Sequence, residues 1–147
     1  MLTSGPVESW ELQAREAIRD TMARYTHAGD RFPLVGVADA FCEDGVLEPE
    51  GGEPVRGRAA IAEFRTAARE RSGTTDAGRL LRHNVANILF ESVTPEEALV
   101  SSYYTTFSEI GVDHMGRYRD RFVPAGDAWL IAHRYVTCDW RAEHSRF

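Results

Sequence analysis

Four long β-rich runs fill the second half of the chain, and this feature restricts the fold more than any other. The runs contain many valine, tyrosine and threonine residues, which favour strands. They cover residues 80–92, 98–110, 114–124 and 129–139. The breaks between them contain Thr94-Pro95, Gly111 and Pro124-Ala125-Gly126-Asp127, which suit turns between antiparallel neighbours. The sequence therefore predicts an antiparallel meander of four strands.

Helical patterns dominate the first half. Apolar residues recur in steps of three and four from about Val7 to Ala28, which predicts a long amphipathic helix. A short helix is expected from about Pro33 to Phe41, and a third from Gly57 to near Ser72. Short strands are expected at 45–50 and 53–56. Helices followed by long strands make an α+β fold, in which the helices pack on one face of a curved sheet.

The length and charge of the chain restrict its domain count and its partners. A chain of 147 residues fits one domain, which we expect over 8–140, with a loose arm at 1–7 and a C-terminal tail at 141–147. The net charge of −6 argues against nucleic acid and against an anionic membrane surface as partners. The sequence has no apolar stretch near the ~18 residues that span a bilayer, and no signal-peptide pattern. These observations predict a cytoplasmic protein.

Several kinds of chemistry are excluded by the residues that the sequence lacks. All 17 basic residues are arginine, so Schiff-base chemistry and lysine-bound pyridoxal phosphate are excluded. Cys42 and Cys138 form no CxxC motif, which favours two reduced, buried thiols over a disulfide. The five histidines form no HExxH motif, and the chain has no phosphate-binding glycine motif. We expect neither a metal nor a cofactor.

Two ionisable residues stand out in largely apolar surroundings. On a strand, His83, Val85 and Asn87 share one face, which favours an inward position for His83. Taken alone, this pattern fits a buried histidine satisfied by hydrogen bonds better than a catalytic one. Asp30 follows the first helix and, taken alone, fits a solvated carboxylate at a helix end or the N-cap of the next helix.

The last two strands place further polar residues inside. In the run 116–122 the inward face carries Tyr118 and also directs His114 inward. The opposite face carries three arginines, which suit water or a subunit interface: Arg117, Arg119 and Arg121. In the final run the alternation directs Arg134 inward, where a buried guanidinium needs a carboxylate partner or a ligand.

The ordered set of elements and motifs resembles the SnoaL-like branch of the NTF2-like superfamily, over roughly residues 8–140. The motifs are the segment from Tyr25 to Asp30, FCEDGV at 41–46, VRGRAAI at 55–61, His83 with Asn87, GRYRD at 116–120, and the segment 129–134. The resemblance implies a cone-shaped barrel, in which a curved, mainly antiparallel sheet wraps around three helices.

The resemblance also implies an activity. The superfamily includes scytalone dehydratase, hexachlorocyclohexane dehydrochlorinase, ketosteroid isomerase, limonene epoxide hydrolase and polyketide cyclases. In the dehydratase and the dehydrochlorinase an aspartate orients a histidine base, and Asp30 and His83 fall at those two places. Arg134 matches a pocket arginine of the dehydrochlorinase, whereas Tyr25 stands where that enzyme has a lysine. The implied function is a cofactor-independent lyase or isomerase that acts on small, largely apolar molecules, including cyclic ones.

The chemistry of these residues leads to a hypothesis about the role of each. His83 would be the general base, with its tautomer and direction fixed by Asp30. Arg134 and Tyr118 would stabilise developing negative charge or protonate the leaving oxygen.

Other residues and other functions remain open at this point. Asn87, Tyr25 and His114 are expected to bind substrate, although Asn87 equally fits a structural hydrogen bond and Tyr25 simple helix packing. The alternative functions are a non-catalytic small-molecule-binding or assembly module, and a polyketide-cyclase-type or epoxide-hydrolase-type enzyme. A homodimer or homotrimer is expected because the arginine stripe suits subunit packing. Convergence of Asp30, His83 and Arg134 in one pocket would favour an enzyme, and the loss of one of them would favour a binding module.

Overall fold

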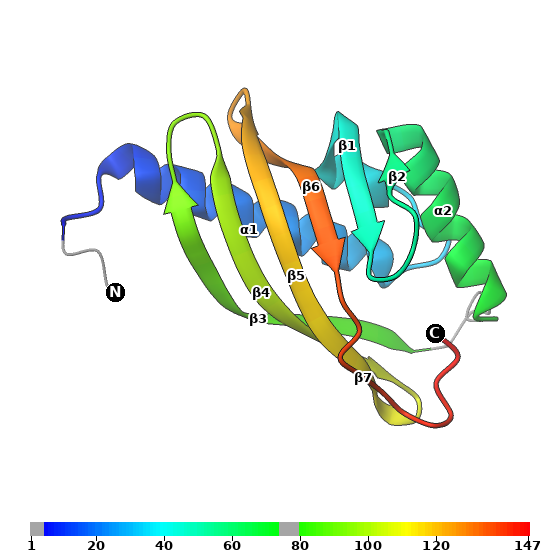
Figure 1. Cartoon of the computed structure of the whole chain (residues 1–147). Helices are drawn as coiled ribbons and strands as arrows, with labels where there is room; N and C mark the ends of the chain where they lie inside the picture. The colour runs from blue at the N-terminus through cyan, green and yellow to red at the C-terminus, as the bar shows by residue number, and fades with distance from the viewer. Residues whose placement is uncertain (1–4, 74–79) are drawn as a thin grey trace.

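In the computed structural model, which describes residues 5–73 and 80–147, two α-helices pack against a curved, unclosed sheet (Figure 1). The elements in chain order are α1 (Ser9–Gly29), the 3-10 helix η1 (Val37–Ala40), β1 (Phe41–Pro49), β2 (Val55–Arg56), α2 (Arg58–Arg71), β3 (Leu81–Val93), β4 (Ala98–Ser108), β5 (Gly111–Ala125), β6 (Ala128–Val136) and β7 (Trp140–Arg141). The predicted α+β class is confirmed.

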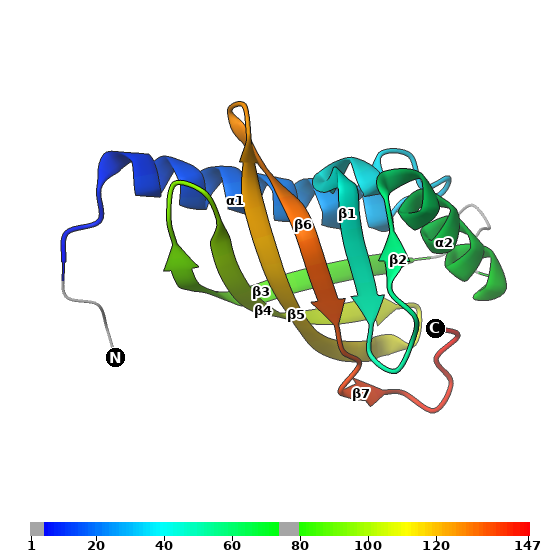
Figure 2. The same cartoon turned by 45° about the horizontal axis from the view of Figure 1, so that its top comes forward.

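The sheet contains the predicted meander. Strands β3, β4, β5 and β6 pair antiparallel in chain order, and β1 joins β6 in parallel. The full order is β2-β1-β6-β5-β4-β3, and β7 pairs with β5. Figures 1 and 2 show α1 lying across one face of this sheet, with α2 beside β1 and β2. Because β3 is an edge strand, the backbone N–H groups on its outer side have no strand partner.

The core lies between α1 and the sheet. The buried positions Ala14, Ile18 and Met22 repeat every four residues along α1, which gives this helix one apolar face and one polar face. Ile18 packs in the same buried cluster as Phe41 of β1 and Ile131 of β6. Each such side chain contributes about 1.5–3 kcal/mol when it is buried. Neither described helix is apolar enough over sufficient length to cross a membrane.

Two expectations from the sequence are corrected. The helix predicted over 33–41 is only the single turn η1, because Gly36 adopts a left-handed conformation with φ of 80° that a regular helix does not allow. The chain between α1 and β1 therefore has no α-helix. The thiols also differ from the prediction: both cysteines are free, but Cys42 is half-buried and Cys138 is exposed.

The alternation predicted for β5 is confirmed. Tyr118, Asp120 and Phe122 are buried on the inner face of the sheet. On the outer face Arg119 and Arg121 are exposed, and half-buried Arg117 forms an ion pair with Asp139 at 2.9 Å: the three arginines are the predicted stripe.

Candidate active site

A small cavity of about 110 Å³ lies between the C-terminal end of α1, the helix α2 and the inner face of the sheet. Side chains from both helices and from five strands line it, so no short segment of the chain forms it alone. Most of its polar and aromatic wall is formed by Tyr25, Arg65, His83, Tyr104, His114 and Tyr118.

His83 lines this cavity and is in contact with Asp30. Asp30 is the residue at which α1 ends, and its backbone N–H donates to the carbonyl of Thr26. Its carboxylate accepts a hydrogen bond from the backbone N–H of His83, on the unpaired edge of β3, and lies 2.6 Å from Nδ1 of the His83 ring. Both side chains are nearly buried, with exposed fractions of 11% and 13%. The carboxylate therefore accepts a hydrogen bond from the backbone N–H at the strand edge and also orients the imidazole.

This contact determines which nitrogen of His83 is available for chemistry. An ionised carboxylate can only accept hydrogen bonds, so the proton of a neutral His83 ring lies on Nδ1 and is donated to Asp30. The other nitrogen, Nε2, then carries a lone pair. A histidine held in this way can act as a general base.

A second histidine–aspartate pair lies nearby. The Nδ1 atom of buried His114 is 2.7 Å from Oδ1 of Asp113, and the rings of His114 and His83 lie 6.3 Å apart between their centroids. Asp113 also accepts hydrogen bonds from the hydroxyls of Ser108 and Ser145. Burial acts to raise the pKa of Asp113, but these three hydrogen bonds outweigh it and lower that pKa. The proton of a neutral His114 ring therefore lies on Nδ1, and Nε2 carries a lone pair.

A β-bulge explains why two adjacent residues both lie on the inner face. Thr106 pairs with His114 and Phe107 pairs with Val112, which leaves Asp113 as an extra residue in β5. Such an extra residue interrupts the alternation of a strand. Simple alternation therefore predicted the inward position of His114 but gave no indication of Asp113.

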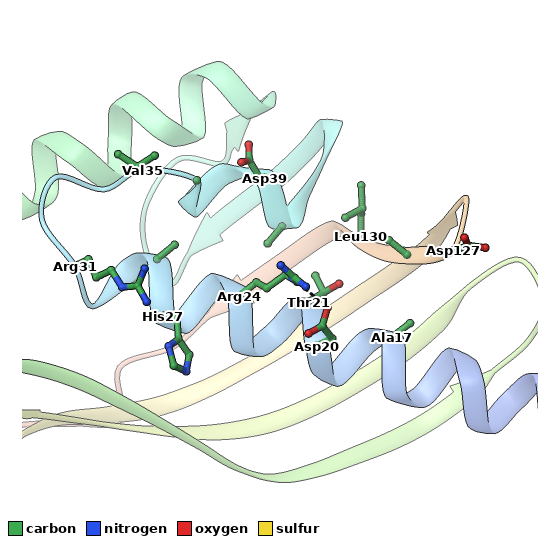
Figure 3. Close-up of a pocket in the computed structure, with 14 residues that line it drawn as sticks. Ala17, Asp20, Thr21, Arg24, His27, Arg31, Val35, Asp39, Asp127 and Leu130 are labelled. Atoms are coloured by element: carbon green, nitrogen blue, oxygen red, sulfur yellow. Dashed lines mark hydrogen bonds and ion pairs between the residues drawn. The ribbon is translucent and has the colours of Figure 1, made fainter.

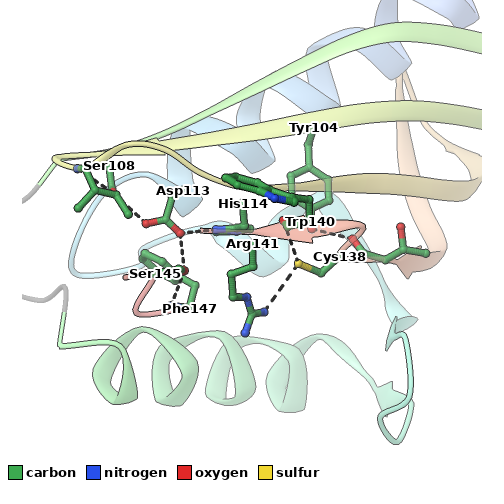
Figure 4. Close-up of polar contacts among 11 residues, drawn as sticks. Tyr104, Ser108, Asp113, His114, Cys138, Trp140, Arg141, Ser145 and Phe147 are labelled. Atoms are coloured by element: carbon green, nitrogen blue, oxygen red, sulfur yellow. Dashed lines mark hydrogen bonds and ion pairs between the residues drawn. The ribbon is translucent and has the colours of Figure 1, made fainter. Parts of the chain in front are cut away.

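The C-terminal segment covers this second pair. Figure 4 shows Ser145 and Phe147 lying against Asp113 and His114, after β7 has paired with β5. The ring of Phe147 is 5.3 Å from that of His114, and Ser145 donates to Asp113 at 2.6 Å. The segment from 141 to 147, which the sequence suggested only as a tail, thus forms part of the wall around His114.

Burial of His114 predicts a pH dependence of stability. Burial lowers its pKa below the ordinary value of 6.5; the hydrogen bond to Asp113 acts in the opposite direction, and the charge of His83 adds to the lowering. The unfolded chain then binds a proton more readily, so stability is complete above pH 6.5 and decreases as the pH falls toward the pKa of the folded state. We expect the melting temperature of His114→Gln to fall less on acidification than that of the wild type. An equal fall in both proteins would contradict this, and exposed His144→Gln is the matched control.

Two tyrosines of the cavity have different tasks. The hydroxyl of Tyr104 donates to the carbonyl of Thr137 at 2.7 Å, so its proton is already used to hold the chain after β6. Tyr118 is stacked on Tyr104, and burial raises the pKa of both phenols well above their ordinary values. Tyr118 is therefore protonated near neutral pH, and its hydroxyl can donate a hydrogen bond to a bound molecule.

Arg134 is not at the cavity surface. Its guanidinium is 1% exposed and forms two hydrogen bonds to the carboxylate of Asp120, at 2.8 and 2.7 Å. It stacks behind the wall, with its Cζ 4.0 Å from the ring centroid of Tyr118 and 4.5 Å from that of Tyr25. Of the two possibilities left open by the sequence, a carboxylate partner or a ligand, the structure has the first.

Asn87 also lies away from the cavity. It adopts a left-handed conformation with φ of 52° at an irregularity in β3, and its side chain is exposed. The bulge ends the shared face that simple alternation assigned to His83 and Asn87. Tyr25, by contrast, does line the cavity.

A larger groove of about 680 Å³, called the outer groove below, lies between α1, the segment 31–40 and the start of β6, but it has no comparable arrangement of residues. Figure 3 shows its charged residues, among them Asp20 and Arg24, which form an exposed ion pair with each other at 2.7 Å. His27 lies in this groove, so it is not a second polar group beside Asp30 in the cavity. In residues 5–73 and 80–147 no three potential metal ligands cluster.

Known proteins share the fold described above. An NTF2-like protein with a cystatin-like fold from Novosphingobium aromaticivorans is 20% identical, covers 97% of each chain and has a TM-score of 0.75. A proposed scytalone dehydratase from the same organism is 23% identical over 90% of this chain and 89% of its own, with a TM-score of 0.74. The β subunit of a proposed aromatic-ring-hydroxylating dioxygenase, also from that organism, is 20% identical over 92% and 94%, with a TM-score of 0.69.

The family of this chain is established by a match in sequence. No curated protein gives a significant match to the chain. Residues 10–135, which include α1 and nearly all of the sheet, match the family model described as SnoaL-like domain. The chain therefore belongs to the SnoaL-like family, within the NTF2-like fold.

Proposed function

We propose that this protein is a cofactor-independent lyase or isomerase, in which His83 removes a proton from a carbon atom of a small, largely apolar substrate. The observation that carries the proposal is the 2.6 Å contact between His83 Nδ1 and Asp30 at the wall of an aromatic cavity. The pair leaves Nε2 of His83 as a base and supplies a carboxylate to stabilise the imidazolium that forms. The name of the similar scytalone dehydratase is consistent with this chemistry.

The proposed elimination proceeds without an external reagent. Nε2 of His83 takes a proton from the carbon next to a carbonyl group, and the C–H electron pair forms a carbon–carbon double bond. The hydroxyl on the neighbouring carbon leaves with its bonding pair and takes the proton that His83 has removed, so that it becomes water. Tyr118 donates a hydrogen bond to the leaving oxygen, and both side chains end the cycle in their starting protonation states. His114 binds a substrate hydroxyl through Nε2, because its Nδ1 proton is committed to Asp113. In an isomerisation the same proton returns to a different carbon.

A direct test uses substrates that report on water loss. We expect the wild-type protein, without added cofactor, to convert at least one member of a panel of small cyclic β-hydroxy ketones into the conjugated enone, which is detected by its ultraviolet absorbance. In D₂O, reversal of the proton abstraction before the hydroxyl leaves should place deuterium on this carbon of the recovered substrate. A protein that binds members of the panel but neither releases water nor exchanges this hydrogen would contradict the proposal.

A second candidate is a non-catalytic ligand-binding or assembly module, and one observation favours it. Arg134, whose presence in the pocket would favour an enzyme, is withdrawn behind the wall and neutralised by Asp120. The similar β subunit of a ring-hydroxylating dioxygenase bears the name of an assembly component. Binding of panel members without turnover is the result that this candidate predicts.

A further inference from the structure

Among the described residues that line the cavity, Arg65 of α2 is the one with a permanent charge. Its Nε atom is buried and has no hydrogen-bond partner within the described parts of the chain. Its Cζ atom lies 5.5 Å from the ring centroid of Tyr25, on the cavity wall. A buried donor without an acceptor is costly, and the described residues supply no acceptor to this Nε atom.

The other arginines close to the core already have acceptors. Arg134 is held by Asp120 through Nε and Nη2, and only its Nη1 lacks a partner among the described residues. Arg58 donates to the carbonyl of Phe41, and Arg69 donates to the carbonyl of Gly29. Arg65, in contrast, faces a cavity whose two nearby carboxylates, Asp30 and Asp113, are each engaged by a histidine.

We propose that Arg65 binds an anionic oxygen of the substrate and so makes the cavity selective for oxyanions. The proposal rests on the proposed function only in using the same cavity, and it names the class of molecule that enters: a small apolar body with one carboxylate or enolate oxygen. A guanidinium presents several fixed N–H donors that suit such an oxygen, and a largely dry wall strengthens the attraction. Two lone pairs, on Nε2 of His83 and of His114, remain for substrate hydrogens.

Binding of matched probes tests this inference without any turnover. Isobutyrate and isobutyramide have nearly the same shape but differ in charge, and 4-nitrophenol reports its ionised form by absorbance. We expect the wild type to prefer the anion in one or both cases by roughly 10- to 100-fold. A preference for isobutyrate identifies a carboxylate, and a preference for 4-nitrophenolate identifies an enolate-type oxygen.

Two variants and a control assign the preference to Arg65. Arg65→Gln should abolish the preference, whereas Arg65→Lys, which keeps the charge but loses Nε, should retain part of it. Arg71→Gln removes an exposed arginine from the same helix and should behave like the wild type. Thermal unfolding verifies that each variant is folded, and Arg65→Lys keeps the test informative if Arg65→Gln is not.

The outcomes separate this inference from the proposed function. A wild-type protein without preference for either anion, or a preference that survives in Arg65→Gln, overturns the role of Arg65. If the anion preference depends on Arg65 but no panel member is turned over, the inference stands and the lyase proposal fails. If neutral ketones are turned over and the protein shows no anion preference, the lyase proposal stands and the role of Arg65 fails.

Discussion

Replacing His83 with alanine is expected to reduce kcat by roughly 100- to 10,000-fold, the usual contribution of a general base. The reason is geometric: Asp30 holds Nδ1 of this ring at 2.6 Å, which leaves the lone pair of Nε2 to accept a proton from the substrate. Steady-state assays on whichever panel substrate is turned over measure the effect. The melting temperature should change little, since His83 is in contact with a cavity and not at the centre of the core.

Asp30→Asn tests the same pair from its other side. An amide can donate as well as accept, so it no longer requires the proton of His83 to lie on Nδ1. We expect a loss of kcat in the same range, with the fold retained. His27→Ala is the matched control, because His27 lies in the outer groove three residues before Asp30. Activity of His83→Ala within tenfold of the wild type, or an equal loss in His27→Ala, would refute the role assigned to this pair.

Asp120→Asn is expected to have the largest effect on stability. Arg134 and Asp120 are 1% and 0% exposed and are joined by two hydrogen bonds. Burial acts to lower the pKa of Arg134, but the Asp120 carboxylate outweighs it, so that this pKa is raised and the arginine stays charged. Removing the carboxylate leaves a buried cation without its counter-ion. The cost should be about 3–5 kcal/mol in the free energy of unfolding, measured with urea.

Two further variants isolate the cause of this loss. Glu97→Gln removes the partner of Arg121 in an exposed pair with a distance of 4.0 Å, and should cost less than about 1 kcal/mol. Replacing both Asp120 and Arg134 with apolar residues removes the cation as well and should recover much of the stability lost in Asp120→Asn. A loss in Asp120→Asn as small as that in Glu97→Gln would show that the buried pair is not needed.

The class of the fold and the direction of many side chains could be predicted from the pattern of residues along the chain. A repeat of three and four residues marked the buried face of α1, and strict alternation marked the inner face of β5 from Tyr118 to Phe122. These patterns can be recognised because an element that buries one face has apolar residues at regular intervals along the chain. The resemblance to a known family added the expectation that Asp30 and His83 pair.

The partner of each polar group, in contrast, follows from the way that distant segments pack together. Arg134 was correctly placed inside, but its carboxylate comes from the neighbouring strand, and it therefore lies outside the cavity. A single extra residue placed Asp113 beside His114, and the packing of α2 against β1 brought Arg65 to the wall. Periodicity indicates whether a side chain is buried. Its hydrogen-bond partners depend on which distant segments come together, and a local pattern of residues carries no information about that.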